Sequence, residues 1–305
     1  MTTAPAASLL LGGPLAAEIR AGVKQRLAAL RERGITAGLA IVTVGEPPAG
    51  NPYVRAKVRA AEEAGARAAV TRLPENVGEN ALRDALGRIA ADPAVHGIIL
   101  QLPLPPPLRE ERHLEDVPPG KDVDGIHPAN VGRWVNGLPA PRPATPLGVQ
   151  ELLRRHLGDL AGRRIAILGR SRIVGRPLSV LLSSREPGMN ATVTLCHSET
   201  RDLPSVTREA EILVVAIGKP RSIGAAHVRP GAVVVDVGIH PVPNPPPGSP
   251  PYTGDVDFEA VRNIVSAITP VPGGVGPLTV AMLLRNLADA AEAAAGTSAR
   301  SGTRP

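Results

Sequence analysis

Residues 164–177 read RIAILGRSRIVGRP: an apolar run, a loop that holds two glycines, and a proline. The run Arg164–Leu168 predicts a buried strand, and Pro177 is typical of the first turn of a helix. A strand, a glycine-containing loop and a helix in this order can present backbone N–H groups to a pyrophosphate. The loop does not follow the G-x-G-x-x-G fingerprint, so an ordinary turn between a strand and a helix remains the alternative.

Apolar strand-like runs and helical patterns alternate on both sides of this stretch. We expect strands at Leu39–Val44, Ala68–Leu73, Gly97–Leu102, Arg164–Leu168, Thr192–Cys196, Ile212–Ala216, Ala232–Val237 and Ile264–Ala267. We expect helices over residues 13–33, 53–64, 78–91, 147–158, 177–184 and 278–295. This alternation predicts an α/β fold with parallel sheets. The length of 305 residues suggests two domains, and the Pro- and Gly-rich segment 118–146 is expected to be a long functional connection.

The composition is typical of a folded protein, with 43% hydrophobic and 20% charged residues. One Trp, two Tyr and one Phe are too few to stack single-stranded nucleic acid. The net charge of +6 comes from scattered basic residues, so we expect no nucleic-acid partner. The single cysteine, Cys196, excludes an intrachain disulfide and a multi-cysteine zinc site. Without a signal-peptide core or an apolar run near ~18 residues, we expect a cytoplasmic protein that does not enter a membrane.

The end of the strand at Thr192–Cys196 bears on the choice of nucleotide. His197 and Ser198 follow it, where an NAD enzyme usually places an acidic residue for the ribose hydroxyls. The hydroxyl of Ser198, together with Arg170 in the glycine loop, suits a 2′-phosphate instead. The pattern therefore favours NADP over NAD, and the alternative is that Ser198 caps a turn.

Three polar residues of the N-terminal half could take part in chemistry. Tyr53 and Lys57 are four residues apart and share one face of the expected helix. A buried amine beside a phenol could act as an acid or a base, although such pairs more often lie on a solvated helix face. Gln101 lies at the carboxyl end of an expected parallel strand, where ligand contacts gather. A structural, hydrogen-bonded glutamine is the alternative there.

Two loops combine residues that can approach or bind a ligand. Residues 121–125 read KDVDG, and two carboxylates without further ligands make a poor metal site, so we expect no metal. One carboxylate could accept paired N–H donors from a heterocycle, or an aspartate could pair with Lys121 in a turn. Residues 269–277 read TPVPGGVGP, in which the prolines stiffen the backbone and the glycines permit close approach to another group.

Seven segments in one order give the chain its resemblance to a known family. They are residues 53–57, 101–105, 121–125, 169–175, 191–198, 236–239 and 270–277. Over almost the whole chain they resemble bifunctional methylenetetrahydrofolate dehydrogenase/methenyltetrahydrofolate cyclohydrolase. The resemblance implies oxidation of 5,10-methylenetetrahydrofolate with NADP, followed by hydrolysis to 10-formyltetrahydrofolate. A monofunctional NAD(P)-dependent dehydrogenase of the same fold is the alternative.

The resemblance also implies an architecture. Residues 1–146 would form a catalytic, folate-binding domain of α/β type, completed by a helix over 277–296. Residues 147–276 would form a Rossmann-type NADP-binding domain, with the active site in the cleft between the two domains. A homodimer is implied as well, and the scattered basic residues suggest polyglutamylated folates as substrates. The composition of residues 297–305 predicts a disordered tail.

The resemblance assigns roles residue by residue. It makes Lys57 the catalytic lysine, with Tyr53 and Gln101 as its partners. Substrate binding is assigned to Asp124, which would hold the pterin ring, and to Pro272 and Gly273 in the folate pocket. NADP binding is assigned to Gly169, Arg170, Ser171, Ser198 and Ile239.

The chain departs from the family pattern at four positions and in one short insertion within 183–190. Gly50 replaces a serine before the tyrosine, and Ala144 replaces a cysteine. Glu211 replaces an aspartate, and His240 replaces the asparagine that usually follows Val-Gly-Ile. None of these changes removes a residue that is assigned to the chemistry, although His240 is expected next to the nicotinamide.

Overall fold

The computed structural model describes residues 7–45, 51–246, 248 and 250–301 of the chain. The chain forms two compact units. The N-terminal unit comprises residues 17–144 and 280–305, and the central unit comprises residues 1–16 and 145–279. Within the described residues, no helix combines the length and the apolar character that are needed to cross a membrane.

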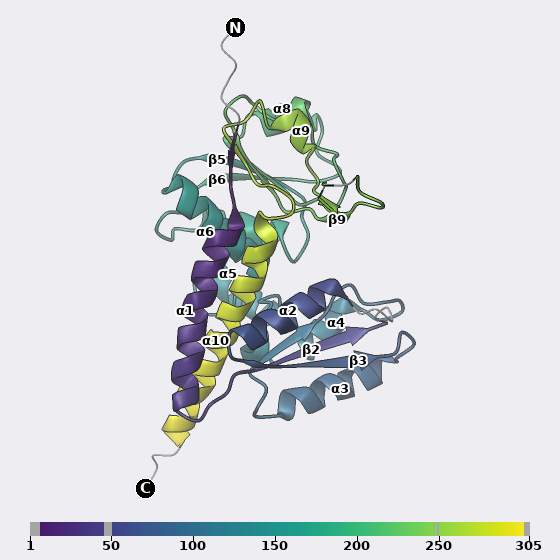
Figure 1. Ribbon diagram of the computed structural model, residues 1–305, viewed down its shortest axis with the longest axis vertical. Helices are drawn as coiled ribbons and strands as arrows, with labels where there is room; N and C mark the ends of the chain where they lie inside the picture. The colour runs from purple at the N-terminus through teal and green to yellow at the C-terminus, as the bar shows by residue number, and fades with distance from the viewer. Residues whose placement is uncertain (1–6, 46–50, 247, 249, 302–305) are drawn as a thin grey trace. The chain divides into compact units, whose positions relative to one another are not determined.

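The N-terminal unit is built on a three-stranded parallel sheet with the order β3-β2-β4. Its strands are β2 (Gly38–Val44), β3 (Arg67–Leu73) and β4 (Gly97–Leu100). The crossover helices are α2 (Pro52–Glu63) and α3 (Glu79–Ala91). The chain moves from β2 outward to β3 and then back past β2 to β4. Right-handed crossovers therefore place α2 and α3 on opposite faces of the sheet, as Figure 1 shows.

Two long helices run side by side in the N-terminal unit, α1 (Gly12–Glu32) in purple and α10 (Val275–Ser301) in yellow (Figure 1). Arg26 of α1 joins them, since its Nε donates to Glu292 Oε1 at 2.8 Å. The helix expected to end before Gly296 continues through this glycine, and α10 extends to Ser301. A glycine inside a helix costs only about 1 kcal/mol relative to alanine, and an alanine-rich sequence precedes Gly296.

The segment expected to be a connection, residues 118–146, contains two helical pieces and the start of a third helix at Ala144. The two pieces are a 3₁₀ turn at Pro119–Lys121 and the helix α5 (Pro128–Val135). The side chain of His127 caps α5 by accepting the N–H of Ala129 at 3.0 Å. Histidine is not among the usual capping residues, and α5 is short, so the sequence pattern does not reveal this helix. A further short helix, α4, spans Glu110–Glu115.

The central unit holds a six-stranded parallel sheet with the order β1-β11-β8-β7-β5-β6. The strands are β1 (Ser8–Leu9), β5 (Arg164–Leu168), β6 (Thr192–Cys196), β7 (Ile212–Val215), β8 (Val233–Asp236) and β11 (Ala267–Ile268). The helices are α6 (Ala144–Leu157), α7 (Gly175–Ser183), α8 (Leu203–Arg208) and α9 (Phe258–Val261). An antiparallel pair, β9 (His240–Pro241) and β10 (Tyr252–Thr253), stands apart from the sheet.

Two features of this sheet differ from the sequence-based expectation. The strand expected at 264–267 lies at Ala267–Ile268, and β1 adds a strand that was not expected. Ser8 of β1 pairs with Ala267 of β11, so this segment belongs to the central unit rather than with the rest of residues 1–146. A two-residue strand carries no periodic pattern, which is why the sequence does not reveal it.

The strand order marks a place for a ligand at the carboxyl end of the central sheet. From β5 the chain crosses to β6 on one side, and the next strand, β7, pairs with the other side of β5. The crevice between the ends of β5 and β7 is therefore a topological switch point. Ligands of open α/β sheets bind at such points.

Candidate active site

Lys57 and Gln101 meet in the N-terminal unit. Lys57 lies on α2, and Gln101 directly follows β4, with its backbone N–H bonded to Val42 O of the neighbouring strand at 2.9 Å. The Nζ of Lys57 donates to Oε1 of Gln101 at 3.1 Å, and Gln101 Nε2 donates to Leu102 O at 2.8 Å. Because the second bond fixes the amide, its oxygen faces the amine. The structure thus brings together two of the predicted catalytic residues.

Tyr53 lies one helical turn before Lys57, in the first turn of α2. Asn51 caps this turn, and its Oδ1 accepts the N–H of Tyr53 at 2.9 Å. The side chain of Tyr53 is 44% exposed. An exposed ring at this place can stack on or cover a ligand. The substituted position Gly50 lies outside the described residues.

Two aspartates of the 121–125 loop have different environments. Asp122 is buried, and its carboxylate accepts Gly125 N at 2.9 Å, His127 N at 2.8 Å and Asn130 Nδ2 at 3.0 Å. It therefore shapes the loop. Lys121 does not form the turn pair considered from the sequence, because its Nζ donates to the carbonyls of two residues at the end of α3, Ala90 and Asp92.

Asp124 is half-buried, and the described residues offer its carboxylate no hydrogen-bond donor. Burial raises the pKa of Asp124 above its ordinary value, the nearby Lys57 opposes this shift, and Asp122 adds to it. Asp124 is therefore close enough to Lys57 for their charges to interact. Within the described residues, no group of three or more His, Cys, Asp or Glu could hold a metal ion. The loop thus presents one carboxylate that is ready to accept donors from a ligand.

The glycine loop of the central unit is shaped by close backbone approach. Gly169 has φ +109°, and a Cβ on it would overlap Ala216 O after β7. A Cβ on Gly175 would overlap Gly169 O in the same way. The Oγ of Ser171 accepts Val174 N at 3.2 Å, just before α7 begins. The two glycines therefore bring the loop and the start of α7 together at the switch point, a cradle that fits a nucleotide phosphate.

The side chains assigned to the nucleotide around this cradle are accessible. Arg170 and Ser171 are exposed in the loop, and Ser198 is exposed after β6. The Oγ of Ser198 donates to Oε1 of the adjacent Glu199 at 3.2 Å. Ile239 is 39% exposed although it is a large apolar residue. Sequence reasoning considered Ser198 and missed Glu199, whose carboxylate accepts the hydroxyl of Ser198.

Two buried aspartates organise the segment around Ile239, and the sequence analysis assigned neither of them a role. Asp236 accepts Gly238 N at 2.9 Å, Asp255 N at 3.0 Å and Val256 N at 2.8 Å. Burial outweighs these bonds and raises the pKa of Asp236 to about 6, with a contribution from the charge of Asp255. Asp236 could have been found from the sequence, because it is an aspartate at the end of an apolar strand. No sequence pattern indicates Asp255.

Pro272 and Gly273 belong to the central unit, whereas Lys57, Gln101 and Asp124 belong to the N-terminal unit. Pro272 is exposed, and Gly273 has φ +110° and accepts Gly12 N at 2.9 Å through its carbonyl oxygen. The loop that contains them leads directly into α10. Its stiffness and positive φ agree with the proline and glycine content that first marked it.

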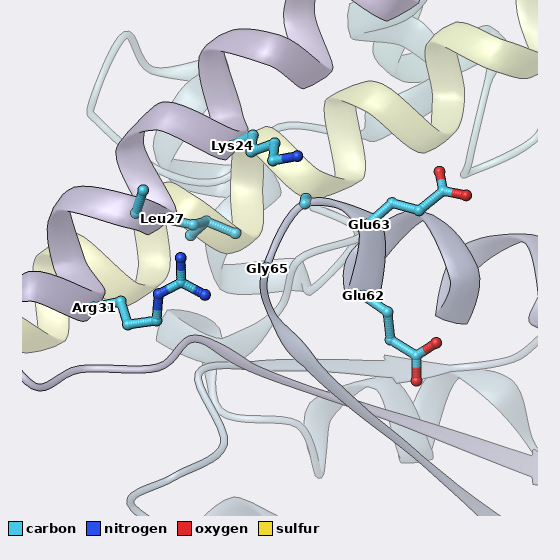
Figure 2. A pocket seen from close by; sticks show the side chains of 8 residues that line it. Lys24, Leu27, Arg31, Glu62, Glu63 and Gly65 are labelled. Carbon is cyan, nitrogen blue, oxygen red and sulfur yellow. The ribbon is translucent and has the colours of Figure 1, made fainter.

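One hollow of about 330 Å³ in the N-terminal unit lies away from the predicted residues. Figure 2 shows it between α1 and the end of α2, with Lys24, Leu27 and Arg31 on one side and Glu62, Glu63 and Gly65 on the other. Its lining mixes both signs of charge, and none of the predicted site residues belongs to it. The hollow is therefore separate from the predicted site residues, which lie on α2, at strand ends and in loops.

Known proteins match the chain over nearly its whole length. Residues 10–124 match the model of the tetrahydrofolate dehydrogenase/cyclohydrolase catalytic domain, and residues 143–295 match that of its NAD(P)-binding domain. The "Bifunctional protein FolD" of Treponema pallidum subsp. pallidum is 51% identical over 292 residues, which is 95% of this chain and 92% of that protein.

Solved structures agree with this match. The bifunctional methylenetetrahydrofolate dehydrogenase/cyclohydrolase of Campylobacter jejuni has a TM-score of 0.87 and 42% identity, covering 94% of this chain and 99% of its own. The enzyme of Trypanosoma brucei, solved with NADP cofactor and an inhibitor, has a TM-score of 0.87 and 36% identity, covering 95% and 99%. The chain therefore belongs to the tetrahydrofolate dehydrogenase/cyclohydrolase family.

Proposed function

We propose that the chain oxidises 5,10-methylenetetrahydrofolate to 5,10-methenyltetrahydrofolate with NADP and hydrolyses this product to 10-formyltetrahydrofolate. The observation that carries the proposal is the Lys57–Gln101 pair with Asp124 nearby, in the unit that matches the family's catalytic domain. A dehydrogenase alone would not need a positioned amine, and this favours the bifunctional activity over the monofunctional alternative.

In the oxidation, the protein mainly aligns the reactants. The one-carbon bridge between two nitrogens of the folate loses a hydride, and the nitrogen lone pairs stabilise the cation that remains. NADP, when bound, supplies the acceptor for that hydride. Little acid–base help is required, so the chain's contribution is to hold both ligands in register.

In the hydrolysis, water adds to the cationic carbon and one of the two C–N bonds opens. Protons must leave the water and reach the departing nitrogen, and Lys57 is the group that moves them. Gln101 keeps the amine of Lys57 oriented through the 3.1 Å bond. Tyr53, exposed one turn earlier, positions the substrate.

The remaining assignments concern binding. Asp124 accepts paired N–H donors of the pterin, and its lack of a donor among the described residues supports this role. Pro272 and Gly273 line the folate pocket. The nucleotide is held by the cradle at the switch point and the side chains around it, namely Gly169, Arg170, Ser171, Ser198 and Ile239. The glycine contacts support this, as does the NADP complex of the trypanosomal relative.

The proposal extends to the oligomeric state, the compartment and the form of the folate substrate. The protein works as a homodimer in the cytoplasm and accepts polyglutamylated folates. The net charge of +6 supports binding of an anionic tail, and the buried, unpaired Cys196 agrees with a reducing compartment. Sedimentation tests the dimer, and a lower KM for polyglutamate than for monoglutamate substrate tests the preference. Equal KM values would contradict it.

An absorbance assay tests the function directly. Purified protein is given methylenetetrahydrofolate with NADP or with NAD, and reduced nucleotide and methenyl product are followed together. Separate addition of methenyltetrahydrofolate measures the hydrolysis. We expect both activities, with NADP preferred. Oxidation without hydrolysis would support the monofunctional alternative, and nucleotide binding without oxidation would contradict the proposal.

A further inference from the structure

We infer that His240 is a positioning residue for the dinucleotide, which acts through Asp255 on two backbone segments of the central unit. The segments are residues 217–218, after β7, and residues 238–240, around Ile239. This inference rests on the proposed NADP-dependent oxidation and adds a residue to it.

The carboxylate of Asp255 is the centre of the arrangement. Asp255 is fully buried, and its Oδ2 accepts Ile217 N at 2.7 Å and Gly218 N at 3.0 Å. Its Oδ1 lies 2.7 Å from Nε2 of His240. An ionised carboxylate can only accept, so Nε2 carries the proton of this bond. A buried carboxylate is stable when all its acceptor sites are satisfied, and His240 supplies a side-chain donor to it.

The same carboxylate also packs against Gly238. A Cβ at this position would overlap the side chain of Asp255, so only glycine allows the two to touch. Ile239 therefore lies between Gly238, which packs against Asp255, and His240, which is hydrogen-bonded to Asp255. This double attachment holds the chain on both sides of Ile239, whose side chain is exposed.

The first of these segments, residues 217–218, adjoins the nucleotide cradle. Ile217 and Gly218 follow β7 at the switch point, and their neighbour Ala216 carries the carbonyl oxygen that Gly169 approaches. If His240 is lost, Asp255 keeps its two backbone donors but loses the bond that ties them to residue 240. Loss of His240 should therefore weaken nucleotide binding. It should leave the hydrolysis unchanged, because Lys57 and Gln101 belong to the other unit.

The test compares His240→Leu, which removes the donor, with His240→Gln, which keeps an N–H donor. His156→Gln is the matched control, because His156 is an exposed histidine on the last turn of α6 in the same unit. For each variant we measure KM for NADP, kcat of the oxidation, the rate of hydrolysis and the melting temperature. Leaving a buried charged acceptor short of a donor is costly, so we expect His240→Leu to raise KM for NADP about tenfold. Hydrolysis should persist, and His240→Gln should recover most of the affinity.

Three results would overturn the inference. The first is an unchanged KM for NADP in His240→Leu. The second is a parallel fall of both activities and of melting temperature, which would make His240 merely structural. The third is an equal effect of His156→Gln. If the wild-type protein did not oxidise the folate at all, the proposed function would fail, and NADP affinity measured by calorimetry on the same variants would still decide the role of His240.

Discussion

The Nζ of Lys57 donates to Oε1 of Gln101 at 3.1 Å, although the two residues are 44 positions apart in the chain. Gln101 is itself held by a 2.8 Å bond from Nε2 to Leu102 O. The amine is therefore fixed by a side chain whose orientation is set by the backbone. A group held in this way can deliver and accept protons at one defined place.

Replacing Lys57 should separate the two activities. In Lys57→Ala, hydrolysis should fall by a factor of about 10²–10⁴, the usual contribution of a positioned acid or base. The oxidation should fall less, because it needs no proton transfer at this site. Initial rates with each substrate measure both effects. Lys24→Ala, an exposed lysine of α1, is the control and should leave both rates unchanged. Full hydrolysis in Lys57→Ala would show that another group moves the protons.

Much of the fold could be predicted, because continuous apolar runs define strands. The bounds of β5 and β6 agree with the expectation, since both runs end at glycine or polar residues. Short elements could not be predicted. The two-residue β1 has no period, and α5 has an unusual histidine cap.

The site was predictable in part, and its assigned roles stay predictions. Motif order selected Lys57 and Gln101, and the structure shows that they meet. The Asp255–His240 pair could not be predicted, because it joins residues 15 positions apart through a reversal of the chain. Such pairs depend on tertiary packing, which local patterns do not report.

Asp124 should govern folate affinity in a pH-dependent way. Asp124→Asn should raise KM for the folate about tenfold, since an amide replaces one of the two acceptor oxygens by an NH₂ group, which would face an N–H donor of the pterin. Burial raises the pKa of Asp124, so the wild-type carboxylate takes up a proton at a higher pH than an ordinary aspartate. Folate binding should therefore weaken as the pH falls through that pKa. KM measured against pH tests this, and Asp84→Asn, exposed on α3, is the control. The same pH profile in Asp124→Asn would assign the titration to another group.

Arg170 should determine part of the preference for NADP. A charged hydrogen bond to a phosphate contributes about 1.5–3 kcal/mol, so Arg170→Ala should lower the ratio of kcat/KM for NADP over NAD by about tenfold or more. Activity with NAD should change little. Arg185→Ala removes an exposed arginine of the same unit and serves as the control. An unchanged ratio in Arg170→Ala would contradict the 2′-phosphate assignment.

Glu199 should weaken the preference for NADP, in contrast to Arg170. Its Oε1 accepts the hydroxyl of Ser198 at 3.2 Å, so it competes with a 2′-phosphate for that donor and repels its charge. Glu199→Gln removes the charge and keeps the shape of the side chain. The variant should therefore have a lower KM for NADP and an unchanged KM for NAD. High salt should reduce the difference between variant and wild type, because both side chains are exposed. A higher KM for NADP would mean that Glu199 orients Ser198 rather than opposing the phosphate.

Asp236 should make the central unit less stable as the pH rises. Burial raises the pKa of Asp236 from 3.8 to about 6, so between these values the folded protein keeps a proton that the unfolded chain releases. Unfolding then releases a proton, and a higher pH favours it. The contribution of Asp236 to the free energy of unfolding is fully present below pH 3.8 and is lost as the pH rises past about 6. The loss is about 3 kcal/mol, since one pKa unit corresponds to about 1.36 kcal/mol. Urea unfolding of wild type and Asp236→Asn at several pH values measures this loss. The free energy of unfolding of the wild type relative to the variant should fall by about 3 kcal/mol as the pH rises. A difference that does not change with pH would show that Asp236 does not carry the raised pKa.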